Sequence, residues 1–480
     1  MRIAPTLLLL TSVSSLVPAS AWAATREVGA GKTYDTPCAA FAAAADNDTV
    51  EIAAGTYTDM CSIDRNGLTI RGVGGRPVID GKGGGALGKG IWIVSGTDIT
   101  IDNVELVNAK VPDQNGAGIR MQGKKLTVRN SVFRNNENGI LTNNVADAEI
   151  VVERCEFDSN GDGRGQAHNM YIGAIKRFVL RESWSHGAKI GHLVKSRAAE
   201  NVIEYNRLTG DAGGTQSYEI DLPNGGRSVV LGNVLEQGDT TDNPSMLAYA
   251  QEGLSEGENS LVVAHNTFVN HRANGSTFVT VNARFTGDAK LVNNIFAGRG
   301  TITNYAAATQ AGSCIEAPTF VDEAGFDFHL APGSACVDTG VDPGMAGTLS
   351  LTPTRQYVHP TSSEGRAAVG APDPGAFELG GGVPDGTSSS SGGASSGGTN
   401  GSSGTSGTGG TSGTGGTSGA TTSGGAGSSN GQVDGNPDAA DESGCSTSPG
   451  RSGGTTALLV ALGLGLVLGR RRARSAARSR

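Results

Sequence analysis

The chain has 480 residues, of which 75 are glycine and only 5% are aromatic. Its 37 basic and 46 acidic residues give a formal net charge of −9, which argues against nucleic acid as a partner. The glycines lack the strict three-residue spacing of collagen, and each helical glycine costs about 1 kcal/mol relative to alanine, which disfavours a helical bundle. A turn-rich β protein with a glycine-rich tail fits this composition.

Residues 1–24 have the features of a secretory signal peptide. Arg2 precedes a short apolar run at Leu7–Leu10, and Ala21-Trp22-Ala23 places small residues before a cleavage site. A membrane anchor is the alternative, but the apolar run is short for one. We therefore expect the chain to be exported.

Exported proteins fold under oxidising conditions, which makes the six cysteines candidates for disulfides. Two of them lie near the start of the folded region and two near its end, and a fifth lies in an apolar strand pattern. We predict two local pairs, Cys38–Cys61 and Cys314–Cys336, and a buried thiol at Cys155.

One short sequence pattern recurs between residues 99 and 296. Two or three β-prone residues precede Asn, Ser or Cys, and Phe or Leu stands two positions further on. The polar position recurs every 23 to 33 residues, at Ser131, Cys155, Ser183, Asn206, Asn233, Asn266 and Asn294. Short strands at this period predict stacked coils of a β-solenoid, with the asparagines in an internal ladder at ~4.8 Å spacing. A β-propeller or a sandwich is the alternative.

An alanine-rich helix is predicted ahead of the repeat, over 38–45, and Gly55-Thr56-Tyr57 ends the strand that follows it. Together with the repeat, these features resemble the right-handed parallel β-helix superfamily of pectate-lyase-like proteins over about residues 26–340. The resemblance implies an all-β, single-stranded, right-handed parallel β-helix at 25–340, capped by the short N-terminal helix. Because Asp373–Glu378 looks like the family's terminus, residues 341–379 are predicted to form the C-terminal cap. We expect a monomer.

Strand alternation predicts which side chains point out of the solenoid on the strand ahead of each ladder strand. With Met170 and Ile172 inside, Asn169 and Tyr171 point outward, and with Ile220 and Leu222 inside, Glu219 and Asp221 point outward. If Val194 points inward, Lys195 and Arg197 point outward; if Leu193 points inward, His192 points outward. Aromatic, amide and charged side chains of both signs converge on this face, which favours a ligand groove over a solvated surface with cross-coil salt bridges. The predicted substrate-binding residues are Arg120, Asn169, Lys189, Tyr218 and Tyr249.

Such a groove suits an acidic polysaccharide. A polysaccharide lyase neutralises a uronate carboxylate, removes the adjacent C5 proton with a base and protonates the leaving oxygen. Lys195 or His192 would be the base if neighbouring cations such as Lys189 and Arg197 lower its pKa, and Tyr171 or Tyr218 would be the acid. The predicted catalytic residues are Lys195, His192, Arg197 and Tyr171. Glu219 and Asp221 offer hard oxygen ligands for calcium.

The segment Val194-Lys195-Ser196, ahead of Glu200-Asn201-Val202, resembles the catalytic-lysine strand of the alginate lyase and chondroitinase B family. That resemblance implies β-elimination with Lys195 as the base. Where the family carries an Arg-His-Gly strand one coil later, residues 221–225 read Asp-Leu-Pro-Asn-Gly. Two other functions stay open: a non-catalytic polysaccharide-binding or adhesive surface protein, and a glycoside hydrolase with Glu219 and Asp221 as its carboxylate pair.

The C-terminal part of the chain has two segments of unusual composition. Residues 380–443 are almost entirely Gly, Ser and Thr, which predicts a disordered tether. Residues 444–480 contain Gly444-Cys445, an apolar run at Ala457–Leu468 and a terminal arginine cluster. As a helix the run spans ~18 Å, less than the ~30 Å core of a bilayer.

The combination of these features in residues 444–480 resembles the C-terminal sorting signal of myxobacterial surface proteins. It implies recognition by sorting machinery, removal near Cys445 and a place at the cell surface or outer membrane, or release from it. A permanent anchor formed by a short hydrophobic helix is the alternative.

Overall fold

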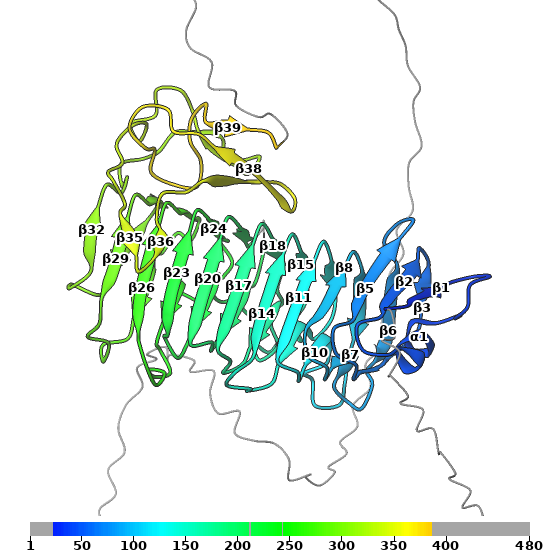
Figure 1. Cartoon of the computed structure of the whole chain (residues 1–480). Helices are drawn as coiled ribbons and strands as arrows, with labels where there is room; N and C mark the ends of the chain where they lie inside the picture. Colours follow the sequence, from blue (N-terminus) through cyan, green and yellow to red (C-terminus); the bar gives the residue numbers. More distant parts are fainter. Residues whose placement is uncertain (1–22, 211–212, 242, 386–480) are drawn as a thin grey trace, which may run out of the picture. The chain divides into compact units, whose positions relative to one another are not determined.

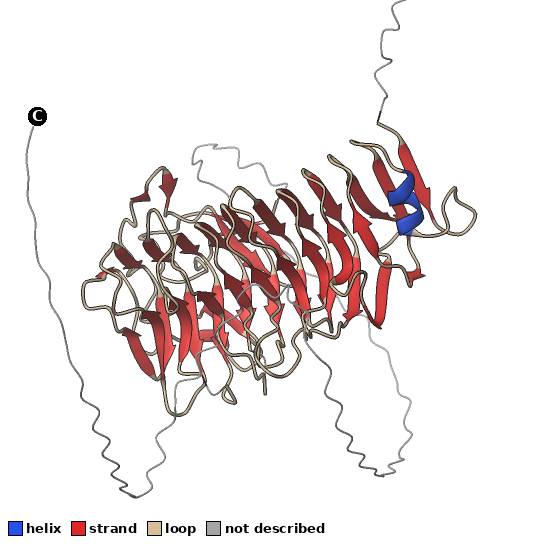
Figure 2. Cartoon of the chain, turned by 90° about the horizontal axis from the view of Figure 1, so that it is seen from below, coloured by secondary structure: helices blue, strands red, loops and turns tan. Residues whose placement is uncertain are grey.

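The computed structural model describes residues 23–210, 213–241 and 243–385. Within these residues the chain forms one helix and a long series of short strands, which confirms the all-β class (Figure 1). Most strands belong to three parallel sheets that the chain visits in turn, A, B and C, once per coil (Figure 2). The predicted tether and signal peptide fall almost wholly outside the described residues, and so does the whole tail with Cys445.

The three sheets consist of strands stacked in chain order. Sheet A contains β1 (Thr25–Val28), β2 (Thr49–Ala53), β5 (Thr69–Val73), β8 (Ile99–Asp102), β11 (Lys125–Arg129), β14 (Glu149–Glu153), β17 (Arg177–Arg181), β20 (Glu200–Glu204), β23 (Arg227–Leu231), β26 (Ser260–Ala264), β29 (Ala289–Val292) and β32 (Thr309–Ala311). Sheet B contains β3 (Thr56–Tyr57), β6 (Val78–Gly84), β9 (Glu105–Ala109), β12 (Val132–Arg134), β15 (Glu156–Asp158), β18 (Trp184–His186), β21 (Arg207–Thr209), β24 (Val234–Gln237), β27 (Thr267–Asn270) and β30 (Ile295–Gly298). Sheet C contains β4 (Cys61–Ile63), β7 (Gly90–Val94), β10 (Ala117–Met121), β13 (Asn138–Thr142), β16 (Met170–Ile172), β19 (Val194–Ser196), β22 (Ile220–Leu222), β25 (Ser245–Tyr249), β28 (Ser276–Val281) and β31 (Gly300–Thr303).

Apolar side chains fill the interior of this parallel β-helix. Leu126 and Val128 of β11 are buried and stack in register on the equivalent residues of β8 and β14. Phenylalanines stack in the same way, with the rings of Phe133 and Phe157 4.8 Å apart. No single coil encloses this core, so each coil depends on its neighbours for burial.

The predicted asparagine ladder is present at the corner between sheets A and B. Asn206, Asn233, Asn266 and Asn294 are each fully buried. Each of the first three donates from its amide nitrogen to the amide oxygen of the next, at 2.9–3.1 Å. The same oxygens accept the backbone N–H one coil earlier, which closes the corner without leaving a buried polar group unpaired.

Helix α1 (Pro37–Ala43) lies at the N-terminal end of the solenoid. Thr36 accepts a hydrogen bond from the Ala39 N–H at 3.4 Å, and Pro37 occupies the first turn, as expected for a helix start. The Phe41 ring packs edge-on against Trp92, with the ring centroids 5.3 Å apart. The predicted disulfide between Cys38 and Cys61 is confirmed and joins α1 to β4.

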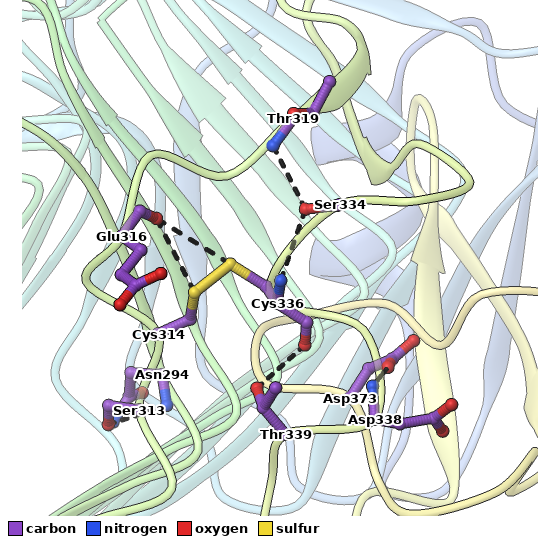
Figure 3. Close-up of a disulfide and its surroundings, with 10 residues drawn as sticks. All are labelled: Asn294, Ser313, Cys314, Glu316, Thr319, Ser334, Cys336, Asp338, Thr339 and Asp373. Atoms are coloured by element: carbon purple, nitrogen blue, oxygen red, sulfur yellow. Dashed lines mark hydrogen bonds between the residues drawn. A yellow bond between two sulfur atoms is a disulfide. The ribbon is translucent and has the colours of Figure 1, made fainter.

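The second predicted disulfide, Cys314–Cys336, is also confirmed and follows the last coil (Figure 3). Close to it, the Ser334 hydroxyl accepts the Thr319 N–H at 3.1 Å. Cys155 is a buried free thiol, as predicted.

The chain beyond the last coil forms small antiparallel sheets: β33 (Phe320–Asp322) with β34 (Asp327–Leu330), β35 (Met345–Ala346) with β36 (Leu349–Ser350), and β37 (Arg355–Val358) with β38 (Ser362–Arg366) and β39 (Gly382–Val383). The segment predicted as a C-terminal cap, residues 341–379, contacts the last coils, where Asn293 donates to the Val341 carbonyl. It also packs on earlier strands, because the Ala376 N–H donates to Thr267 of β27. The C-terminal segment therefore also covers part of the outer face of sheet B. The candidate site lies on sheet C.

Candidate functional site

The strands of sheet C are paired so that one outward position per coil forms a continuous row. Val194, Ile220 and Leu222 belong to the core, so the residues between them on β19 and β22 point outward. The row consists of Arg120, Leu141, Tyr171, Lys195, Asp221 and Ala248. The predicted outward orientation of Lys195 and Asp221 on one face is therefore confirmed.

Four charged side chains and one amide meet on this face. The Lys195 ammonium lies 3.6 Å from Asp221 Oδ2 and 3.4 Å from Glu252 Oε1. Arg197 holds the other oxygen of the same carboxylate, with Nη2 2.6 Å from Glu252 Oε2. Its Nη1 donates to Asn224 Oδ1 at 2.6 Å. Two cations two residues apart, one in β19 and the other just after it, thus share a single carboxylate.

Tyr171 lies one coil earlier and contacts both cations of the cluster. Arg197 Nε donates to the Tyr171 hydroxyl at 3.1 Å, and the Lys195 ammonium lies 5.2 Å from the centroid of the Tyr171 ring. That distance is within the range of a cation–π contact. Arg120, on the same row, donates to Asn143 at 2.9 Å, which places it on the predicted face but nearer the N-terminal end.

Two stacked imidazoles and a phenol tilted at 56° to the second of them lie along the edge of this cluster. The ring centroids are 4.4 Å apart for His168 and His192, and 4.9 Å apart for His192 and Tyr218. His168 Nδ1 accepts the His192 N–H, and His192 Nδ1 accepts the Tyr218 N–H, so in the neutral rings Nε2 carries the proton. His192 Nε2 lies 3.5 Å from Asp221 Oδ2.

Burial sets the protonation states of the cluster. Burial, with the charges of Lys195 and Arg197, holds the pKa of His192 well below its usual range, so this ring is neutral. Burial raises the pKa of Asp221 to about 6, although the Lys195 ammonium opposes the shift. Burial also disfavours the Lys195 ammonium, but Asp221 and Glu252 outweigh this effect and the pKa of Lys195 is raised.

The expectation that neighbouring cations lower the pKa of Lys195 is therefore wrong. Lys195 lies between two carboxylates, which keep its side chain in the ammonium form at neutral pH. Lys189 does not contribute to this cluster either. Its ammonium donates to Asn135 Oδ1 at 2.7 Å, in the turns between sheets B and C.

Two predicted substrate-binding residues lie inside the solenoid. Tyr249 is fully buried because its register pairs it with the inward Leu222, and its hydroxyl donates to the Gly226 carbonyl at 2.6 Å. Asn169 stands at the corner before β16, where its side chain turns inward rather than outward. It forms part of a second internal ladder, in which the amide nitrogen of Asn160 donates to its oxygen at 3.0 Å. Alternation fails at Asn169 because a corner resets the direction of the side chains.

Glu219 is a third residue that the alternation rule misplaced. It stands at the corner before β22, is fully buried, and accepts a hydrogen bond from Gln216 Nε2 at 3.3 Å. Burial raises the pKa of the Glu219 carboxyl well above its usual range, and the charge of Glu236 adds to the shift. Glu219 Oε2 and Gln216 Oε1 have no hydrogen-bond partner. A proton on Glu219 would allow these two oxygens to pair.

Glu219→Gln is therefore expected to make the protein more stable at high pH. The stability contributed by a carboxyl with a raised folded pKa is complete below its unfolded value near 4.5 and is lost as the pH rises through the folded value. Glutamine keeps the shape and cannot ionise, so the midpoint of thermal unfolding of the variant should vary less between pH 5 and 9. At pH 9 we expect a gain of about 1–2 kcal/mol, measured by thermal denaturation. A variant whose pH profile matches that of the original chain would contradict the expectation that the buried Glu219 carboxyl has a raised pKa.

The predicted calcium site of Glu219 and Asp221 is not formed, because the two carboxyl groups face different surroundings, Gln216 in one case and Lys195 in the other. Among the described residues, one group of three possible metal ligands lies together on sheet B: Glu156, Asp158 and His186. The Arg134 guanidinium already bonds both carboxylates of this group, at 3.0 and 2.7 Å. Because the Arg134 guanidinium occupies both carboxylates, these residues do not fit a metal centre.

Sequence reasoning did not assign a role to Glu252 or Asn224, which complete the cluster. Both lie in turns that leave sheet C, and the Glu252 N–H donates to the Pro223 carbonyl at 2.9 Å, which brings the two turns together. Turn residues follow no periodic rule, so their contact with Arg197 has no signal in the sequence pattern. The second ladder was missed because its asparagines are irregularly spaced.

Comparison with known proteins supports the fold. Residues 60–233 match the family described as right handed beta helix region, which agrees with the three parallel sheets of the structure. The pectate lyase Pel9A is 16% identical, with a TM-score of 0.49 over 75% of this chain and 97% of that chain. A pectin methylesterase from Aspergillus niger is 14% identical, with a TM-score of 0.27 over 61% and 85% of the two chains. ORF18 of Geobacillus virus E2 is 16% identical, with a TM-score of 0.33 over 55% and 52%.

A search of curated proteins found no match. Within the part of the chain that the structure describes, no helix has both the length and the apolar character needed to cross a bilayer.

Proposed function

We propose that the outward face of sheet C binds an acidic polysaccharide and holds a sugar carboxylate between Lys195 and Arg197. The observation that carries this proposal is the Glu252 carboxylate, whose two oxygens lie 3.4 Å from Lys195 and 2.6 Å from Arg197. Its position demonstrates that the two cations accommodate one carboxylate. Charge-assisted contacts of this kind are the usual means of recognising an organic acid.

The side chains around the cation pair suit a sugar. Tyr171 and Tyr218 are half-buried, the first beside Lys195 and the second beside the His192 ring, and tyrosines of this kind can pack a sugar ring and also hydrogen-bond it. Glu252 is the most exposed carboxylate of the cluster, with 21% of its side chain accessible, while the side chain of Asp221 is 5% accessible. A ligand carboxylate would displace Glu252 and leave Asp221 in place.

β-Elimination is a second candidate, favoured by Asp221. A carboxyl with a pKa of about 6 beside a neutral imidazole is poised for proton transfer near neutral pH. In this reaction Lys195 and Arg197 neutralise the uronate carboxylate, and Asp221 or His192 takes the C5 proton. The C4–O bond then breaks, the C4–C5 double bond forms, and Tyr171 protonates the leaving oxygen. A hydrolase that uses Glu219 and Asp221 is not supported, because Glu219 lies inside the solenoid.

We further propose that the chain is exported and displayed at the cell surface, or released, by the signal and sorting segments of its sequence. This proposal rests on residues 1–24 and 444–480 alone. Fractionation of cells that express the full chain, with and without Cys445→Ala, would test it. Retention in the cytoplasm would overturn it.

The binding proposal predicts opposite effects for two variants of the same ion pair. Arg197→Gln should weaken binding of the full chain to polygalacturonate about tenfold, since one charge-assisted contact is lost. Glu252→Gln should strengthen binding, because the competing internal carboxylate is gone. Isothermal titration with polygalacturonate, alginate and chondroitin measures both effects, and Arg129→Gln on sheet A is the matched control.

Failure of the original chain to bind any of the three polymers would exclude the proposed function. The same mixtures report β-elimination through the ultraviolet absorbance of the new double bond. Absorbance that is abolished by Asp221→Asn would identify a lyase, whereas binding without absorbance would identify a non-catalytic binding protein.

A further inference from the structure

A pocket lined by charged residues lies in the turns that lead from sheet B to sheet C. It has a volume of about 340 Å³, in the range of sites for small organic ligands. Four successive coils contribute to it, through Lys110, Asn135, Glu137, Gly161, Asp162 and Lys189. The last two of these coils also carry His168 and His192, so the pocket and the cluster around Lys195 draw on the same coils.

The pocket contains the ammonium groups of Lys110 and Lys189 and the carboxylates of Glu137 and Asp162. Lys110 is exposed, and Lys189 is half-buried and contacts Asn135; neither forms an ion pair within the described residues. One oxygen of the Glu137 carboxylate, Oε2, accepts the N–H groups of Val111 and Gly116, at 3.0 and 2.6 Å.

Asp162, the other acid of the pocket, forms an ion pair with Arg164, whose Nη2 lies 2.7 Å from Asp162 Oδ2. Burial and the nearby charge of Lys110 lower the pKa of Lys189, although Asp158 opposes the shift. A bound anion would relieve this repulsion between like charges.

The backbone of Lys189, which lines this pocket, packs closely against Gly161. Gly161 lies against it so closely that a Cβ there would come within 2.8 Å of the Lys189 carbonyl oxygen. The Lys189 N–H donates to the Asn160 carbonyl at 2.8 Å, and Gly161 has a φ of +116°. Glycine is required at this position because only glycine permits both the close approach and the positive φ.

We propose that the pocket of Lys110 and Lys189 is a second carboxylate subsite, which takes a further uronate residue of the chain bound at Lys195 and Arg197. The inference rests on the proposed function and adds a length requirement to it. A short oligomer reaches one cation pair only, whereas a longer one spans both and gains affinity from the second.

The test compares di- and octagalacturonate binding by the full chain and by the Lys110→Gln/Lys189→Gln variant, using isothermal titration. We expect the variant to bind the octamer about tenfold more weakly and the dimer unchanged. Methyl esterification of the octamer removes its charges but keeps its length, so the difference between the two proteins should then disappear. Lys124→Gln, an exposed lysine paired with Asp147 at 2.7 Å, is the matched control.

Equal octamer affinity in the original chain and the double-lysine variant would overturn the second subsite while leaving the first intact. Weaker binding of the esterified octamer by the variant would also overturn it, because the lysines would then act through structure rather than charge. Failure of the original chain to bind either oligomer would overturn the proposed function and the subsite together. Unchanged thermal unfolding of the variant would confirm that the lysines are not needed for folding.

Discussion

Lys195→Met is expected to destabilise the protein by about 3–5 kcal/mol at pH 8 and by much less at pH 5. The Asp221 side chain is 5% accessible, and Lys195 is its closest cation at 3.6 Å. Removal of the ammonium leaves a buried carboxylate whose pKa, already raised to about 6, rises further. At pH 5 Asp221 is protonated and neutral, so the penalty is small. As the pH rises, ionisation of Asp221 becomes unfavourable in the folded state only, and stability falls.

Thermal denaturation between pH 5 and pH 8 measures this effect. Lys125→Met is the matched control, since Lys125 forms an exposed ion pair with Asp98 at 2.7 Å and its loss should change stability by less than about 0.5 kcal/mol. The double variant Lys195→Met/Asp221→Leu should recover most of the stability at pH 8, because no uncompensated charge remains. An equal loss at both pH values would show that packing, rather than the buried charge, explains the role of Lys195.

Asn233→Ala should destabilise the solenoid by roughly 3–5 kcal/mol, independently of pH. Asn233 donates to the Ile203 and Leu231 carbonyls, and its oxygen accepts both the backbone and the side-chain N–H of Asn206. Alanine leaves several of these buried groups unpaired, and each such group costs about 1–3 kcal/mol. The asparagine ladder would be interrupted in its middle, between Asn206 and Asn266.

The midpoint of chemical or thermal unfolding is the appropriate measurement, because stacked coils need not unfold in one step. Asn144→Ala is the control. Asn144 is an exposed turn residue whose oxygen accepts one N–H, from Ala174 at 2.7 Å, so its loss should be mild. Equal effects of the two substitutions would contradict a special role for the ladder.

The parts of the fold that were predictable share a physical basis in local periodicity. The polar position at Asn206, Asn233 and Asn266 repeats because every coil turns the same corner and must satisfy the same backbone groups there. The disulfide pairs were predictable because each joins cysteines 22 or 23 residues apart, about one coil. Strand alternation predicted Lys195 and Asp221 correctly, since both stand in the middle of a strand.

The errors arose where alternation stops. Asn169 and Glu219 each precede a strand of sheet C, at a corner that turns their side chains inward. Tyr249 pairs in register with the inward Leu222, so its side chain lies in the core rather than on the outer face. Glu252 and Lys110 lie in turns, where residue type says little about which neighbour a side chain meets.

The sequence alone therefore determined that this protein is a glycine-rich β-helix. Because the coils are alike, core, corner and ladder residues recur along the sequence with a period of about one coil. Only the tertiary structure decided what surrounds each charge. It placed Lys195 between two carboxylates, which raise its pKa and keep it charged, so that it does not fit the role of a base. The pKa of an ionisable group depends on burial and on charges from other coils, and neither is encoded in the residues next to it along the chain.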